Sequence, residues 1–125
     1  MLKDFTNRQN FIIMKLVTKA IEQKLIKNYN LPDERKKDLK PVVKFFTPFA
    51  QCTWLITEYA PEYNEFFGLC DLGLGFPELG YVSREEIEFV RKLGLNDIER
   101  DRGFKADKTL AEYAEIARVR GMIIA

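Results

Sequence analysis

Three segments of β-strand character follow one another closely in the middle of the chain. They cover residues 42–47, 52–59 and 65–71, and each is rich in β-branched and aromatic side chains. The connections between them, residues 48–51 and 60–64, have the length and composition of hairpin loops. The sequence therefore predicts an antiparallel meander.

The second of these segments shows an alternating pattern. With a repeat of two residues, Trp54, Ile56 and Glu58 share one face of the strand, and Tyr59 lies on the other. One face is then mainly apolar and ends in a carboxylate. This pattern predicts that Glu58 lies at a rim of the sheet.

The first helix has two possible starts. A capping-box pattern at Thr6 and Gln9 would begin a long helix with an apolar stripe, whereas Thr18 would cap a shorter helix over residues 19–28. The residues alone leave both open. A Pro32-containing turn ends either helix, and the charged stretch 33–40 is expected to be an exposed loop.

Two further helices follow the meander. Ser83 with Glu86 forms a capping box for a helix that stops at Gly94, and Thr109 forms another with Glu112 for a terminal helix. The terminal helix is expected to end near Gly121, and Tyr81 and Val82 can make a short fourth strand before the middle helix. The predicted fold class is α+β, with an antiparallel sheet of about four to five strands and N-terminal, middle and C-terminal helices packed on it.

Composition narrows the classes of protein. The chain has 125 residues and no histidine, so the commonest general base, the Ser-His and Cys-His nucleophile pairs and imidazole-dependent zinc sites are excluded. Ten Phe, five Tyr and one Trp suffice for the core of one domain. Cys52 and Cys70 lie in apolar stretches and are expected to be inert thiols. Without an export signal or a membrane-length apolar run, the chain is expected to be cytoplasmic with no membrane partner.

Charge is distributed unevenly along the chain. Residues 1–44 carry 11 basic and 5 acidic side chains, whereas residues 45–101 carry 4 basic and 11 acidic. The basic part could contact nucleic acid phosphates, and the acidic part could mimic phosphates or hold a cation. The alternative is two solvated faces of opposite sign that serve solubility.

Basic and aromatic residues provide the candidates for a binding surface. Lysines of the first third would form an electrostatic rim, and exposed aromatic rings would stack nucleobases. Core packing is the ordinary role of such aromatics, and Arg100 between two carboxylates could instead bridge loops structurally. The candidate binding residues are Lys36, Lys37, Lys40, Lys44, Trp54, Tyr59, Tyr81 and Arg100.

Carboxylates near predicted strand ends and turns provide the alternative, catalytic hypothesis. If they converged, two or three of them could hold Mg²⁺ for phosphodiester cleavage, whereas separate ion pairs would make them structural. This candidate set is Glu58, Glu78, Glu99 and Asp101. A third hypothesis is an inhibitor that presents Glu85, Glu86 and Glu88 to a nuclease as a phosphate mimic.

Several blocks resemble one known family. They are Met14 to Lys19, Val43 to Pro48, Thr53-Trp54 with Glu58, Phe66 to Leu69, Pro77 to Ser83, and Ile98 to Asp101 with Phe104. In this order they resemble a family of small bacterial proteins that is classed as a domain of unknown function and is met on plasmids, integrative elements and phages.

The resemblance adds expectations of its own. Relatives often begin at the position of Met14, which implies that residues 1–13 are an extension, that residues 14–125 form the single α+β domain, and that Thr18 is the helix cap. Many relatives carry a histidine before the Pro-Glu-Leu-Gly-Tyr block, where this chain has Leu74-Gly75-Phe76. The resemblance implies an accessory role in mobile-element biology.

Together these observations favour a protein that binds without catalysis, acting on nucleic acid or on a host protein that handles nucleic acid or serves in defence. No cofactor is expected on this hypothesis. The alternative is a Mg²⁺-dependent single-strand phosphodiesterase that uses the carboxylate set.

Overall fold

A five-stranded antiparallel sheet forms the centre of the computed structural model, which describes residues 15–48, 50–93 and 98–125. The strand order is β4-β3-β2-β1-β5. The predicted meander is confirmed, and β5 joins its far edge beside β1. The strands are β1 (Val43–Phe46), β2 (Thr53–Ala60), β3 (Glu65–Asp71), β4 (Glu78–Ser83) and β5 (Glu99–Arg100).

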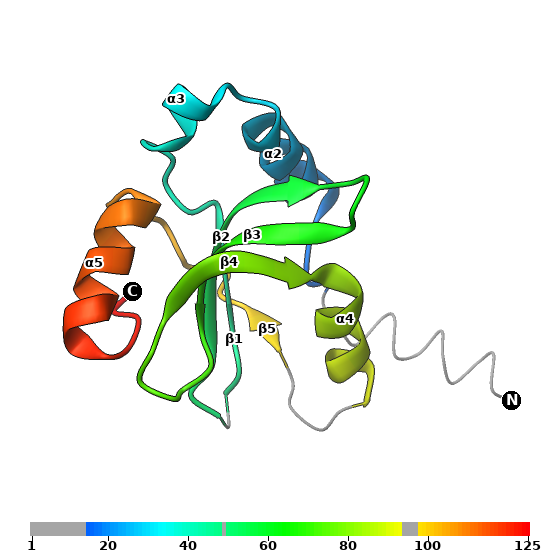
Figure 1. Ribbon diagram of the computed structural model, residues 1–125. Helices are drawn as coiled ribbons and strands as arrows, with labels where there is room; N and C mark the ends of the chain where they lie inside the picture. The colour runs from blue at the N-terminus through cyan, green and yellow to red at the C-terminus, as the bar shows by residue number, and fades with distance from the viewer. Residues whose placement is uncertain (1–14, 49, 94–97) are drawn as a thin grey trace, which may run out of the picture.

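Helices cover both faces of the sheet, so the predicted α+β class is also confirmed. Helices α2 (Lys19–Tyr29) and α4 (Arg84–Leu93) lie on one face and α5 (Leu110–Arg120) lies on the other (Figure 1). Each face buries its own apolar cluster: Leu25 and Ile87 pack with Phe45 and Phe66 on the first face, and Leu55, Leu69, Leu110, Tyr113 and Ala117 pack together on the second. A single turn, α3 (Asp33–Lys36), connects α2 with β1.

The caps of the helices follow the local sequence. Thr18 Oγ1 accepts a hydrogen bond from Ile21 N at 3.2 Å, which confirms the shorter of the two possible first helices. Thr109 and Glu112 make the complete predicted capping box, and Gly121 ends α5 with φ +74°. The start at Thr6, the stop at Gly94 and the extension 1–13 lie outside the described residues.

Two elements differ from the expected pattern. The charged stretch after α2 forms the turn α3, since Asp33 and Glu34 in its first turn and Lys36 in its last suit the helix dipole. Strand β4 begins at Glu78, earlier than expected, because Leu79 pairs with Leu69 of β3. Tertiary pairing thus extends a strand beyond the residues that local propensity marks.

A β-bulge in β2 changes which residues share a face. Ile56 pairs with Gly68, whereas Glu58 pairs with Phe67, so Thr57 is an extra residue in the ladder. Beyond the bulge Tyr59 joins the cluster under α2, while Thr57 and Glu58 both lie on the α5 side. The predicted alternation was therefore wrong from Glu58 onward. Glu58 lies two residues before the end of β2 and beyond the last residue that pairs with β1, and it is buried there.

The edge of β2 beyond the bulge is completed by a helix. Strand β1 pairs with β2 only as far as Ile56. Past this point Asn28 of α2 donates a side-chain hydrogen bond to the Thr57 carbonyl oxygen at 2.9 Å. The side chain therefore satisfies a backbone group that the ladder leaves without a strand partner.

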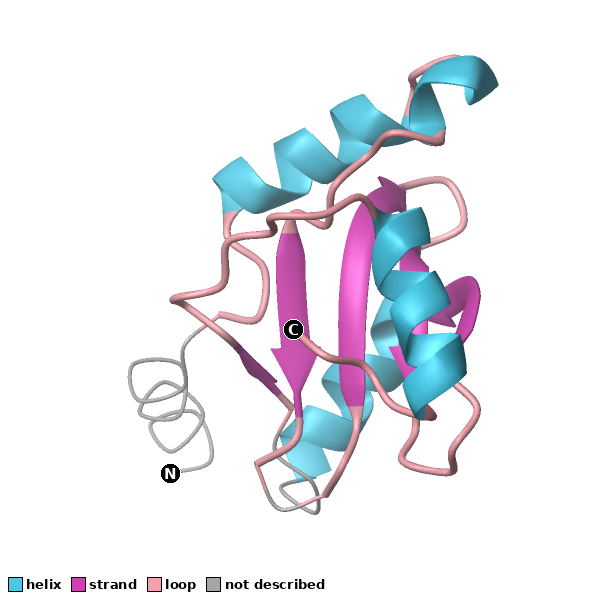
Figure 2. Cartoon of the chain, turned by 90° about the vertical axis from the view of Figure 1, so that its left-hand side faces the viewer, coloured by secondary structure: helices cyan, strands magenta, loops and turns pink. Residues whose placement is uncertain are grey.

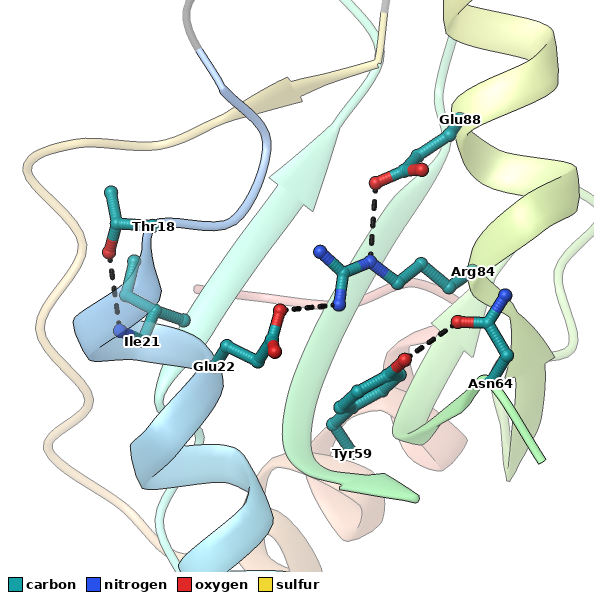
Figure 3. Close-up of polar contacts among 7 residues, drawn as sticks. All are labelled: Thr18, Ile21, Glu22, Tyr59, Asn64, Arg84 and Glu88. Atoms are coloured by element: carbon teal, nitrogen blue, oxygen red, sulfur yellow. Dashed lines mark hydrogen bonds and ion pairs between the residues drawn. The ribbon is translucent and has the colours of Figure 1, made fainter. Parts of the chain in front are cut away.

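Arg84 joins three elements, α2, α4 and β2, on the α2 side of the sheet (Figure 3). Its guanidinium lies 2.7 Å from Glu22 of α2 and 3.2 Å from Glu88 of α4, and it stacks 4.9 Å from the ring centroid of Tyr59. The Tyr59 hydroxyl donates to Asn64 Oδ1 at 2.7 Å. Burial lowers the pKa of Arg84, but the hydrogen bonds to both glutamates raise it above its ordinary value.

Replacing this arginine, Arg84→Met, is expected to lower the free energy of unfolding by about 1–2 kcal/mol. Methionine keeps the apolar stem but loses the charged hydrogen bonds and the stacking on Tyr59. The matched control is Arg118→Met, because Arg118 also pairs with a glutamate but has a side chain 70% exposed. Its change should stay within about 0.5 kcal/mol. Urea denaturation measures the free energy of unfolding of both variants. Equal losses for the two would contradict the stabilising role of Arg84.

The two thiols are both free and half-buried. Burial raises the pKa of Cys70 to about 11, so this thiol is protonated at neutral pH. A protonated thiol is a poor nucleophile, which agrees with the expected inert role. No described helix is long and apolar enough to cross a membrane.

Candidate binding pocket

A pocket of about 340 Å³ opens on the α5 side of the sheet. Figure 2 views the molecule from this side, with α5 in front of the strands. The pocket lies between α3, the start of α5 and strands β2 to β4. Its lining residues are Asp33, Lys36, Lys37, Thr57, Glu58, Phe67, Leu79, Tyr81, Leu110 and Ala111. This volume is near the lower end for small-ligand sites, about 300–1,000 Å³.

A paired carboxylate lies inside the pocket. Glu58 is 6% exposed, and one carboxylate oxygen lies 3.0 Å from Lys36 Nζ of α3. The Lys36 ammonium also lies 5.0 Å from the ring centroid of Tyr29. A buried carboxylate without a partner would be costly, so this lysine compensates its charge. The pair offers a strong acceptor and a strong donor side by side.

Aromatic rings form another wall. Tyr81 is 62% exposed, and its ring centroid lies 5.0 Å from that of Phe67 in an edge-on arrangement. The two residues pair across β3 and β4. Tyr29, next to Lys36, donates a hydrogen bond to Glu62, and this bond raises the pKa of Tyr29 to about 12. The pocket thus has a largely exposed ring at Tyr81 on which a planar group could stack.

Basic side chains extend from the mouth of the pocket. Lys37 lines it and is exposed, and Lys40 is exposed further along the connection to β1. A hydrogen bond of 2.8 Å from Leu110 N to the Leu39 carbonyl oxygen ties this connection to the start of α5. The two walls of the pocket are therefore joined through the backbone.

Four of the predicted site residues meet in this pocket. Three were proposed as binding residues, namely Lys36, Lys37 and Tyr81, and one as a catalytic alternative, Glu58. Their positions along the chain gave no indication that they would meet. Thr57, Phe67 and Leu79 were missed because their place in the pocket depends on the bulge and the strand register.

The other predicted aromatic residues are part of the core. Trp54 and Tyr59 are each 7% exposed and belong to the cluster under α2 and α4. Neither ring is available for stacking with a ligand. Both residues therefore have the ordinary role of packing in the core.

The remaining basic candidates lie away from the pocket. Lys44 on β1 donates to the Ala125 carbonyl oxygen at 2.9 Å and lies 3.8 Å from Asp101. Arg100 is on β5, where its buried Nη1 has no hydrogen-bond partner among the described residues. Burial and the nearby charge of Arg102 lower the pKa of Arg100. The loop-bridging role expected for this guanidinium is thus not seen in the described part of the chain.

The four candidate carboxylates do not converge. Glu78 is on β4 and Glu99 is on β5, at opposite edges of the sheet, and four strand spacings of about 4.8 Å separate those edges by about 19 Å. Asp101 follows β5 and lies near Lys44. Within the residues that the structure describes, no group of three or more His, Cys, Asp or Glu side chains could hold a metal ion.

Comparison with known proteins identifies a family for this chain. A family model described as "Protein of unknown function (DUF2958)" matches residues 16–124. The chain therefore belongs to this family, which confirms the resemblance to a domain of unknown function. No curated protein and no solved structure matches the chain significantly.

Proposed function

We propose that the chain is a non-catalytic binding protein of mobile genetic elements and that its pocket binds single-stranded nucleic acid. The observation that carries the proposal is the position of Tyr81, an exposed aromatic ring, beside Lys36 and Lys37 in one pocket. Proteins that bind single strands combine aromatic rings, on which bases stack, with cationic groups along the phosphate backbone. The association with mobile elements rests on the family resemblance.

The size of the pocket supports binding of one base at a time. About 340 Å³ can hold a planar base, whereas a folded duplex needs a wider surface. Lys37 lines the pocket and Lys40 is exposed three residues further along the chain, and on this proposal both contact the phosphates that flank such a base.

The geometry favours binding over cleavage. In the pocket the nearest charged partner of Glu58 is a lysine, and the other three candidate carboxylates lie on or beside the edge strands. Cleavage with Mg²⁺ would need two or three carboxylates on one face. The set Glu58, Glu78, Glu99 and Asp101 does not supply that arrangement.

Binding is tested by fluorescence anisotropy with a labelled single-stranded oligonucleotide of about twelve nucleotides. Tyr81→Ala is expected to weaken binding by about tenfold, because it removes the stacking surface. The control is Phe76→Ala, since Phe76 is 81% exposed in the loop between β3 and β4 and does not line the pocket. This control should bind as the unchanged protein does.

The charge contribution is measured in the same assay. Lys37→Gln should reduce the salt slope of the logarithm of affinity by about one, whereas Lys19→Gln, at the first residue of α2, should leave it unchanged. Affinity that does not fall with salt, or equal losses for Tyr81→Ala and Phe76→Ala, would refute the proposal. Host-protein binding would then be the remaining form of the binding hypothesis.

A further inference from the structure

We infer that the pocket recognises guanine among the bases, through the Glu58–Lys36 pair. This inference rests on the proposed binding of single strands and deepens it. The Watson–Crick edge of guanine has two adjacent donors, N1–H and the N2 amino group, followed by the O6 acceptor. A carboxylate beside an ammonium group presents the complementary sequence of two acceptors and one donor. In the pocket these groups lie 3.0 Å apart.

The other bases match this pair less well. Adenine and cytosine offer the carboxylate one amino group on this edge, with acceptors next to it. Thymine and uracil place their single N3–H between two carbonyl oxygens, which the carboxylate repels. Guanine alone satisfies both oxygens of Glu58 and leaves O6 for Lys36.

Burial makes the difference between bases matter. Glu58 is 6% exposed, so water has little access to its carboxylate once a base is bound. A base that offers no hydrogen-bond donor leaves a carboxylate oxygen without a partner, which costs binding free energy. The Lys36 side chain is 24% exposed and can turn toward O6 without leaving Glu58 unpaired. The ion pair is then extended by the base rather than broken.

The charge balance also favours a base over a phosphate inside the pocket. The charged lining residues are Asp33, Lys36, Lys37 and Glu58, two of each sign. An uncharged planar base fits this balance, and Tyr81 offers its ring for stacking. The phosphates remain outside the pocket, near Lys37 and Lys40.

The test uses base analogues in the unchanged protein, so that folding is not at issue. Four oligonucleotides of about twelve thymidines are compared: one uninterrupted, and three with a single central guanosine, inosine or 7-deazaguanosine. Inosine lacks the N2 amino group, whereas 7-deazaguanosine keeps the whole Watson–Crick edge. Guanosine and 7-deazaguanosine should bind about tenfold tighter than inosine, because the lost hydrogen bond is to a charged group.

A protein variant locates the effect. Glu58→Gln replaces one carboxylate oxygen by an amide donor, so the preference for guanosine over inosine should fall to about twofold or less. If guanosine and inosine bind equally to the unchanged protein, or if Glu58→Gln retains the full preference, the guanine assignment is wrong while single-strand binding stands. If none of the four oligonucleotides binds, the proposed function itself fails.

Discussion

Replacing Gly68 by alanine is expected to lower the free energy of unfolding by about 3 kcal/mol or more, or to prevent folding. A Cβ atom at this position would lie 1.9 Å from the Leu55 carbonyl oxygen and 2.9 Å from the Ile56 Cα atom. Both are backbone atoms of β2, which cannot rotate away as a side chain could. The strands β2 and β3 would have to separate at the centre of the sheet, next to the bulge.

The control for this substitution lies directly opposite. Gly80 on β4 pairs with Gly68, but a Cβ atom at Gly80 would have no heavy atom within 4 Å. Gly80→Ala is therefore expected to change the free energy of unfolding by no more than about 0.5 kcal/mol. Urea denaturation and the yield of soluble protein measure both variants. A Gly68→Ala protein as stable as Gly80→Ala would show that β2 and β3 lie further apart at Gly68 than described.

Replacing Phe66 by alanine is expected to lower the free energy of unfolding by about 4 kcal/mol. The side chain is fully buried, and its ring centroid lies 5.5 Å from that of Phe45 and 5.3 Å from that of Tyr59. The Arg84 guanidinium lies 5.7 Å from the same ring. Alanine would leave a cavity that β1, β2 and α4 border, and rigid strands cannot close such a cavity.

Two comparisons make the result interpretable. Phe66→Leu keeps most of the volume and should cost about 1–1.5 kcal/mol. Phe76→Ala removes the same number of atoms from an exposed ring and should stay within about 0.5 kcal/mol. Thermal unfolding measures all three. A loss for Phe66→Ala close to that for Phe76→Ala would contradict the description of the core under α2 and α4.

Much of the fold could be predicted from local sequence. The meander follows from strand propensity and hairpin-length loops, and the caps at Thr18, Ser83 and Thr109 follow from side chains that bond to backbone groups three residues away. These signals depend on neighbours in the chain. Strand β5 has only two residues, and its place beside β1 depends on contacts that are distant in sequence.

The candidate site was predictable only as separate residues. Lys36, Lys37 and Tyr81 were identified by charge and aromatic character, but their meeting depends on how α3 and β4 approach the same face of the sheet. Glu58 was assigned to the wrong face, since periodicity assumes an uninterrupted ladder and nothing in the residue types around Thr57 marks the extra residue. The core roles of Trp54 and Tyr59 likewise depend on helices that cover them.

The extra residue in β2 also sets how closely polar groups can be spaced along a strand. In a regular strand, side chains on one face are about 6.8 Å apart, because every second residue points away. At the bulge the hydroxyl of Thr57 and the carboxylate of Glu58 are consecutive and share a side. A rigid strand can in this way present two consecutive polar side chains to one cavity, a close spacing that loops more commonly provide.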